Sequence, residues 1–130
     1  MKLYETYGDN DKRKKIIPTI IKKYSQNKNI KIVSRNLKMN FVHIESLMLV
    51  IDMIINNKVQ EGEYCIKNKK FTKIKNLIDL LNKKLKKKIK TKYLSSMKFF
   101  NYKNKLKNFP YWSDKKNLET FLLGKLKKLE

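Results

Sequence analysis

Residues 51–64 read IDMIINNKVQEGEY and decide the predicted fold. The stretch closes a long apolar segment, turns through Asn56-Asn57-Lys58 and enters a β-prone run that starts at Val59. Isoleucines and leucines before the turn recur at helical spacing, which predicts a long helix over residues 42–56 with Asn40 as its N-cap. Asparagine tolerates the left-handed backbone conformation, so we expect the helix to end at this turn.

A β-hairpin is predicted after the long helix. Two short β-prone runs, residues 59–66 and 71–74, stand on either side of the polar turn Lys67-Asn68-Lys69-Lys70. Cys65 is expected to be a small core residue of the first run.

Two helices are predicted before the long one. Residues 11–24 carry an apolar face, and Pro18 either starts or bends that helix. Residues 30–38 predict a short helix with Ile30, Val33 and Leu37 turned inward.

The order helix, short helix, tight turn, long helix and hairpin over residues 12–74 resembles the winged-helix superfamily. The phrase at 51–64 is similar to the end of PCI-type and DDRGK-type domains, which close the long helix with an apolar pair, a turn and a short wing. The resemblance implies that the long helix is a recognition helix in the DNA major groove, or a contact with another subunit. Because residues 41–57 contain no Lys or Arg, we expect this helix to lie mainly in the core or against a protein partner.

Further helices are predicted over residues 74–90 and 93–107, and a last one contains Leu118 and Leu129, capped by Ser113 or Asp114. The predicted fold class is mainly α with a small β-hairpin, as a winged-helix core with a C-terminal helical extension. The predicted domains are an irregular N-terminal arm (1–11), a winged-helix-like domain (12–74) and a lysine-rich helical extension packed on it (75–130).

Charge dominates the functional prediction. The 130 residues hold 33 Lys and Arg against 11 Asp and Glu, a formal net charge of +22. Between residues 64 and 108 the one acidic residue is Asp79. The repulsion within such a highly charged chain is tolerated most easily when the chain binds a polyanion. We therefore expect one cationic surface that binds nucleic acid.

Lysine suits phosphate contacts better than base readout. The alternative is a solvated helix face in a lysine-rich chain. The aromatic residues of 93–112 could stack bases or pack the last helix onto the core, and both possibilities stay open. The candidate nucleic-acid-binding residues are Lys67, Lys69, Lys70, Lys83, Lys84, Lys86, Lys87, Lys88, Lys90, Lys103, Lys105, Lys107, Tyr102 and Trp112.

Catalytic chemistry is not predicted. His43 is the only histidine and is expected to be structural or to cap a helix. No His/Cys cluster suits zinc, and the three glycines, Gly8, Gly62 and Gly124, form no phosphate loop. We therefore expect no enzyme, no catalytic residues, no metal and no cofactor.

The predicted function is a non-enzymatic protein that binds DNA or structured RNA, such as ribosomal RNA, through mainly backbone contacts. The alternative is a protein-interaction scaffold subunit with a PCI-like winged helix, and a homodimer through apolar helices is possible. A third possibility, a cationic helix at 72–90 on anionic lipid, is not favoured. The single cysteine and the absence of an apolar run of about 18 residues predict an intracellular protein without a membrane partner.

Overall fold

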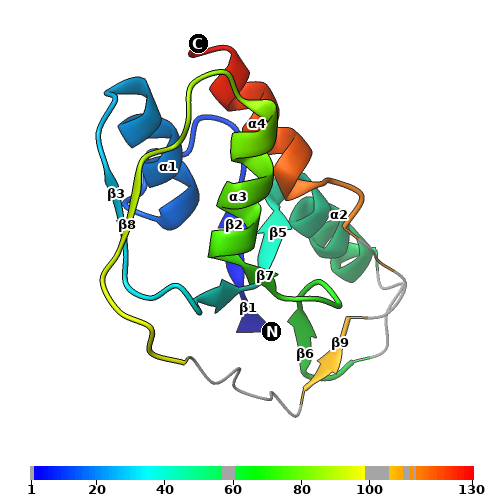
Figure 1. The fold of residues 1–130 in the computed structure, drawn as a ribbon. Helices are drawn as coiled ribbons and strands as arrows, with labels where there is room; N and C mark the ends of the chain where they lie inside the picture. The colour runs from blue at the N-terminus through cyan, green and yellow to red at the C-terminus, as the bar shows by residue number, and fades with distance from the viewer. Residues whose placement is uncertain (1, 57–60, 99–105, 110–111, 113) are drawn as a thin grey trace.

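The computed structural model describes residues 2–56, 61–98, 106–109, 112 and 114–130. Its helices are α1 (Ile16–Ser25), α2 (Ile44–Ile55), α3 (Ile74–Lys84) and α4 (Leu118–Lys127). Figure 1 shows α3 near the middle of the molecule, with α1 and α2 on opposite sides of it. No helix in the described ranges is long and apolar enough to cross a bilayer.

Short strands, paired mostly in parallel, join these helices. In chain order they are β1 (Lys2–Leu3), β2 (Glu5–Tyr7), β3 (Ile30–Ile32), β4 (Lys38–Met39), β5 (Phe41–His43), β6 (Tyr64–Ile66), β7 (Thr72–Lys73), β8 (Thr91–Tyr93) and β9 (Lys107–Asn108).

The segment that contains β1 and β2 pairs with two strands that lie far along the chain. Its first strand, β1, pairs in parallel with β6, which pairs in parallel with β9. Its second strand, β2, pairs in parallel with β5, so that Tyr7 lies opposite His43. The β3–β8 pair is also parallel, whereas β4–β7 is antiparallel. The amino-terminal residues, expected to be an irregular arm, therefore contribute two strands.

Helices cover the two faces of these strands. In β5 the side chain of Phe41 belongs to one buried cluster and that of Val42 to another, because successive strand residues point to opposite faces. The Phe41 cluster contains the inner faces of α1, α3 and α4, while the Val42 cluster contains Leu47 and Val50 of α2. The chain thus has an α/β architecture rather than the predicted mainly α one.

The prediction of a short helix over residues 30–38 is wrong, because the segment starts with strand β3. Burial alternates through Ile30, Lys31 and Ile32, which is the period of a strand. Val33, which a helix would have turned inward, is 48% exposed. The long helix begins at Ile44 instead of Val42, since Phe41–His43 forms a strand that is buried on both faces. A continuous apolar run does not reveal by its periodicity where such a strand gives way to a helix.

In the described residues, the two strands of the predicted wing do not pair with each other. The run that ends at Ile66 forms β6, but its partners are β1 and β9 rather than β7. In turn, β7 pairs with β4. The first two residues of the predicted hairpin strand over 59–66, residues 59 and 60, lie outside the described part of the chain.

Three helix predictions have mixed outcomes. Helix α1 begins at Ile16, and Pro18 lies in its first turn, where a backbone N–H has no helical partner to lose. Helix α3 ends at Lys84, because Leu85 adopts an extended backbone, and the chain then forms β8. The last helix forms as α4, but it ends at Lys127, so that Leu129 lies beyond it and is exposed, and Asn117 caps it rather than Ser113 or Asp114.

Residues 93–98, predicted to start another helix, finish β8 and continue without helix, while 99–105 lie outside the described ranges. The division of the chain at residues 11 and 74 stays a prediction.

Candidate functional site

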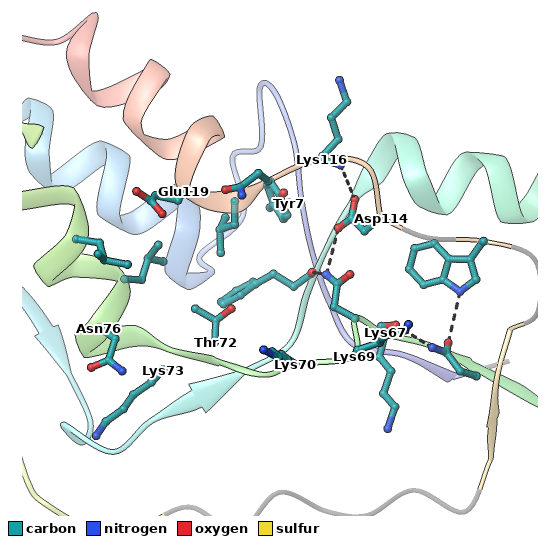
Figure 2. A pocket seen from close by; sticks show the side chains of 18 residues that line it. Tyr7, Lys67, Lys69, Lys70, Thr72, Lys73, Asn76, Asp114, Lys116 and Glu119 are labelled. Carbon is teal, nitrogen blue, oxygen red and sulfur yellow. Dashed lines mark hydrogen bonds between the residues drawn. The ribbon is translucent and has the colours of Figure 1, made fainter.

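A cleft of about 640 Å³ opens where several strands end. Its lining includes Tyr7, the last residue of β2, Asn108, the last residue of β9, and Lys67–Lys70, which directly follow β6. Ligands of open α/β sheets bind in the crevice outside the carboxyl ends of parallel strands. We call this cavity the strand-end cleft, and Figure 2 shows the side chains that line it.

Cations surround much of this cleft. Its lining includes Lys67, Lys69, Lys70, Lys73 and Lys116, against two carboxylates. Lys116 pairs with Glu45 at 3.1 Å. In the part of the chain that the structure describes, no carboxylate forms an ion pair with the other four lysines. These four ammonium groups can therefore neutralise an anionic ligand.

The walls between α3 and α4 are partly apolar. Leu77 and Leu80 of α3 face Leu118 of α4 across the cleft, with Phe41 of β5 also in the lining. A cavity that combines apolar walls with a few polar and charged groups is typical of a small-molecule site.

The loop that carries the cleft lysines is held by a pair of asparagines. The side-chain Oδ1 of Asn40 accepts from the backbone N–H of Asn68 at 2.8 Å, and its Nδ2 donates to the Asn68 carbonyl oxygen at 2.9 Å. Asn40, predicted to cap a helix, is 2% exposed and instead fixes this loop. The helix cap is His43, whose Nδ1 accepts from the backbone N–H of Glu45 at 3.1 Å, which confirms its structural role.

Asp114 joins the cleft to the start of α2. Its carboxylate accepts from Ser46 Oγ at 2.7 Å, from the backbone N–H of His43 at 3.3 Å and from Asn68 Nδ2 at 3.2 Å. It also accepts from the backbone N–H of Lys116 at 3.1 Å. This carboxylate is therefore held as an acceptor and places a fixed negative charge in the cleft lining.

Tyr7 lies at the floor of the same cleft. Its ring makes edge contacts with the rings of His43 and Phe121, each at a centroid distance of 5.0 Å. Burial, and then the negative charge of Asp114, raise the pKa of the Tyr7 hydroxyl. The hydroxyl consequently stays protonated and is available as a donor.

The structure brings together some of the predicted nucleic-acid-binding residues. Lys67, Lys69, Lys70 and Trp112 line the strand-end cleft, and the indole Nε1 of Trp112 donates to Asn108 Oδ1 at 3.4 Å. Lys107 is exposed on β9. Tyr102, Lys103 and Lys105 lie outside the described residues.

The predicted lysines in the last turn of α3 and directly after it do not line this cleft. Lys84 pairs with Glu119 at 2.9 Å, and Lys87 lies over the ring of Tyr24 at 5.2 Å from its centroid. Lys88 Nζ donates to backbone carbonyl oxygens at the end of α3. The predicted patch is thus divided, and its described members outside the cleft are Lys83, Lys84, Lys86, Lys87, Lys88, Lys90 and Lys107.

Sequence reasoning missed Tyr7, Asn76 and Asn117 and gave Asp114 only a capping role, although all four line the cleft. Strand-end polar residues are a usable signal, but only once parallel strands are recognised. A second cleft, of about 830 Å³, lies between α1, α4 and residues 8–14 and is lined by cations such as Arg13 and Lys125. Arg13 is already bound to Asp11 at 2.7 Å.

No family model matches the chain. CDP-abequose synthase of Yersinia pseudotuberculosis is 36% identical over 62 residues, which are 48% of this chain and 21% of that protein.

Two solved structures resemble nearly the whole chain. UDP-glucuronic acid 4-epimerase of Bacillus cereus, in complex with UDP-glucuronic acid and NAD, matches with a TM-score of 0.70 and 17% identity over 98% of this chain and 44% of its own. dTDP-glucose 4,6-dehydratase of Bacillus anthracis, in complex with NAD, matches with a TM-score of 0.65 and 16% identity over 95% of this chain and 41% of its own. The chain spans less than half the length of these enzymes.

These similarities overturn the functional prediction. The similar proteins are enzymes that act on sugar nucleotides, so the expectations of a non-enzymatic protein, of a DNA or RNA partner and of a PCI-like scaffold are wrong. The winged-helix resemblance is wrong too, because the pattern of apolar positions that suggested it also fits strands that pair at long range. The chain has the Rossmann-like α/β fold with parallel strands found in these sugar-nucleotide epimerases and dehydratases.

Proposed function

We propose that this chain binds a sugar nucleotide in the strand-end cleft, as part of an NAD-dependent sugar-nucleotide epimerase or dehydratase. The observation that carries the proposal is the group of Lys67, Lys69 and Lys70 in the loop after the parallel strand β6, with Lys73 of β7 in the same cleft. A sugar nucleotide offers a pyrophosphate to these lysines and an uncharged sugar to the rest of the cleft. An intracellular location, expected from the single cysteine, belongs to the same proposal.

The 130 residues do not fit the dinucleotide itself. Rossmann-type sites bind the pyrophosphate of NAD at a Gly-x-Gly-x-x-Gly turn, and no such turn can be formed by Gly8, Gly62 and Gly124. A Cβ at Gly8 would come within 2.6 Å of Ile44 Cγ2, so this glycine serves the close approach of the chain to α2 and not a ligand. Gly124 lies inside α4. We therefore assign the sugar-nucleotide side of the reaction to this chain and derive no step through NAD.

The proposal is tested by calorimetric titration of the chain with UDP-glucose. We expect saturable binding in wild type and a loss of about tenfold or more in affinity when Lys67, Lys69 and Lys70 are replaced together by Gln, because charge-assisted hydrogen bonds are lost. The matched control replaces Lys83, Lys86 and Lys90 by Gln, which removes the same charge outside the cleft. Equal losses in both variants, or no binding in wild type, would contradict the proposal.

A further inference from the structure

Among the described residues, one buried hydrogen-bonding group of the cleft has no partner in the folded chain. The Tyr7 hydroxyl is buried and, among the residues that the structure describes, it is the one buried side-chain N or O atom without a hydrogen-bond partner. Tyr7 as a whole is 1% exposed. Native proteins satisfy most buried polar atoms, because an unsatisfied one costs free energy, so this exception points to a partner outside the folded chain.

A second buried tyrosine shows the usual solution. Tyr24 is 3% exposed, and its hydroxyl donates to the carbonyl oxygen of Lys87 at 2.9 Å and lies 3.1 Å from Glu130 Oε1. The same chemical group is thus satisfied within the chain in one place and left open in another. The open hydroxyl belongs to the tyrosine that lines the strand-end cleft.

The ring of Tyr7 has little freedom to find another partner. It is held by β2, and the rings of His43 and Phe121 pack edge-on against it. Its hydroxyl is covered in the free chain, so any contact with a ligand forms as the ligand enters and the side chains over the hydroxyl shift. A fixed donor of this kind is the arrangement expected of a residue that orients a ligand.

Charge divides the cleft into two ends. Figure 2 shows Lys69, Lys70 and Lys73 along one side of the cleft, with Tyr7, Asp114 and Lys116 along the other. The charge of Lys116 is paired with that of Glu45. The fixed carboxylate of Asp114 disfavours a phosphate oxygen beside Tyr7, whereas the lysines attract one. An uncharged oxygen is free of this repulsion and can accept the hydrogen bond that Tyr7 offers.

We propose that Tyr7 is a specificity-determining residue that donates a hydrogen bond to a hydroxyl oxygen of the sugar, while Lys67, Lys69 and Lys70 hold the phosphates. This inference rests on the proposed function, because it assigns the orientation of the sugar nucleotide in the same cleft. The sugar lies at the Tyr7–Asp114 end and the pyrophosphate at the lysine end.

The test compares UDP-glucose with UDP, which differ at the sugar end, in calorimetric titrations of wild type, Tyr7→Phe and Tyr24→Phe. Wild type should bind UDP-glucose more tightly than UDP. Tyr7→Phe should lower the affinity for UDP-glucose about fivefold to tenfold, which is the loss expected for one neutral hydrogen bond. Its affinity for UDP should stay within about twofold of wild type. Tyr24→Phe, the matched control, should change neither affinity.

Stability provides a readout of opposite sign. Tyr7→Phe removes a buried unsatisfied hydroxyl, so the free protein should unfold at a higher denaturant concentration, while Tyr24→Phe breaks a satisfied hydrogen bond and should unfold at a lower one. A merely structural Tyr7 would change the unfolding midpoint without changing the ratio of the two affinities. As a second variant, Asp114→Asn removes the charge that repels phosphate, so its affinity for UDP should rise severalfold.

The outcomes separate the inference from the function on which it rests. If wild type binds UDP-glucose through its cleft lysines but Tyr7→Phe leaves the ratio unchanged, the role of Tyr7 is overturned and the proposed function stands. If Tyr7→Phe weakens both ligands equally, the orientation is likewise overturned. If wild type binds neither ligand, the proposed function fails and the inference fails with it.

Discussion

The side-chain amide of Asn40 bonds to the backbone of Asn68 as a neighbouring strand would. It satisfies both the N–H and the carbonyl oxygen of Asn68, at 2.8 and 2.9 Å. Asn68 in turn donates its own amide to the carbonyl oxygen of Phe41 and to Asp114. The lysine-bearing loop after β6 is therefore fixed to the residues that flank β5. This connection positions the charged side of the cleft relative to its polar floor.

Replacement of Asn40 by Ala should destabilise the chain and loosen that loop. In this variant the backbone N–H and carbonyl oxygen of Asn68 both lose their hydrogen-bond partner. Because the Asn40 side chain is buried, we expect the free energy of unfolding to fall by about 2–3 kcal/mol. UDP-glucose should also bind more weakly, because the lysines are less well ordered. Urea denaturation and titration measure the two effects.

The control for this loop is Asn36, whose amide donates to the carbonyl oxygen of Ser96 at 2.7 Å outside the cleft. Asn36→Ala should cost about 1 kcal/mol or less and leave binding unchanged. A change of less than about 0.5 kcal/mol in Asn40→Ala would show that the Asn40–Asn68 pair does not hold the loop.

Gly8→Ala should destabilise the fold through a contact with α2. The added Cβ would lie 2.6 Å from Ile44 Cγ2, closer than side chains tolerate, so we expect a loss of about 1–3 kcal/mol in unfolding free energy. Shortening the partner in Gly8→Ala/Ile44→Ala should restore part of that loss. Failure of the double variant to recover any stability would place the strain elsewhere.

Gly124→Ala should have the opposite sign. A Cβ at this position of α4 meets no atom within 4 Å, and alanine is a better helix former than glycine. We expect a gain of about 0.5–1 kcal/mol in thermal or chemical denaturation. A loss of stability would mean that α4 does not have the packing described above.

Ser46→Ala should uncouple α2 from the cleft. The Ser46 hydroxyl donates to the Asp114 carboxylate at 2.7 Å and is 3% exposed, so its removal should cost about 1–3 kcal/mol. Ser46→Thr, which retains the hydroxyl, should recover part of this stability. Equal losses in the two variants would indicate that packing and not the hydrogen bond matters here.

Alkaline pH should weaken the fold through Tyr24. Burial, assisted by a hydrogen bond to Glu130, raises the pKa of Tyr24 to about 12. A raised folded pKa contributes stability that is complete below the unfolded pKa and is lost as the pH rises from about 10 to 12. The difference in unfolding free energy between wild type and Tyr24→Phe, measured from pH 8 to 12, should therefore fall across that window. A difference that stays constant would contradict the burial of an ionisable Tyr24.

Local pattern predicted helices best, because the backbone hydrogen bonds of a helix join residues that are close together in the chain. Leucines at helical spacing predicted helix α4. The position of His43 at the start of an apolar helix predicted its capping role. The wing failed because β6 pairs with residues 2–3 and 107–108, far away in the chain, and periodicity contains no information about such partners.

The candidate site was predictable only in part. The turn signal at Lys67-Asn68-Lys69-Lys70 grouped three lysines that do lie together in one cleft, although no hairpin carries them. Net charge suggested an anionic ligand but not its size, which misdirected the reading toward nucleic acid. Nothing in the sequence around Tyr7 indicates that its hydroxyl lacks a partner, because that property depends on His43, Phe121 and Asp114 packing around it.

The most direct test of a sugar-nucleotide site in the strand-end cleft is the change in backbone amide chemical shifts when UDP-glucose is added to the ¹⁵N-labelled chain. We expect the largest changes at residues 67–73, at Asn76 and at residues 114–117, saturating with one ligand per chain. Changes concentrated at residues 83–90 or 12–28, or no changes at all, would contradict it.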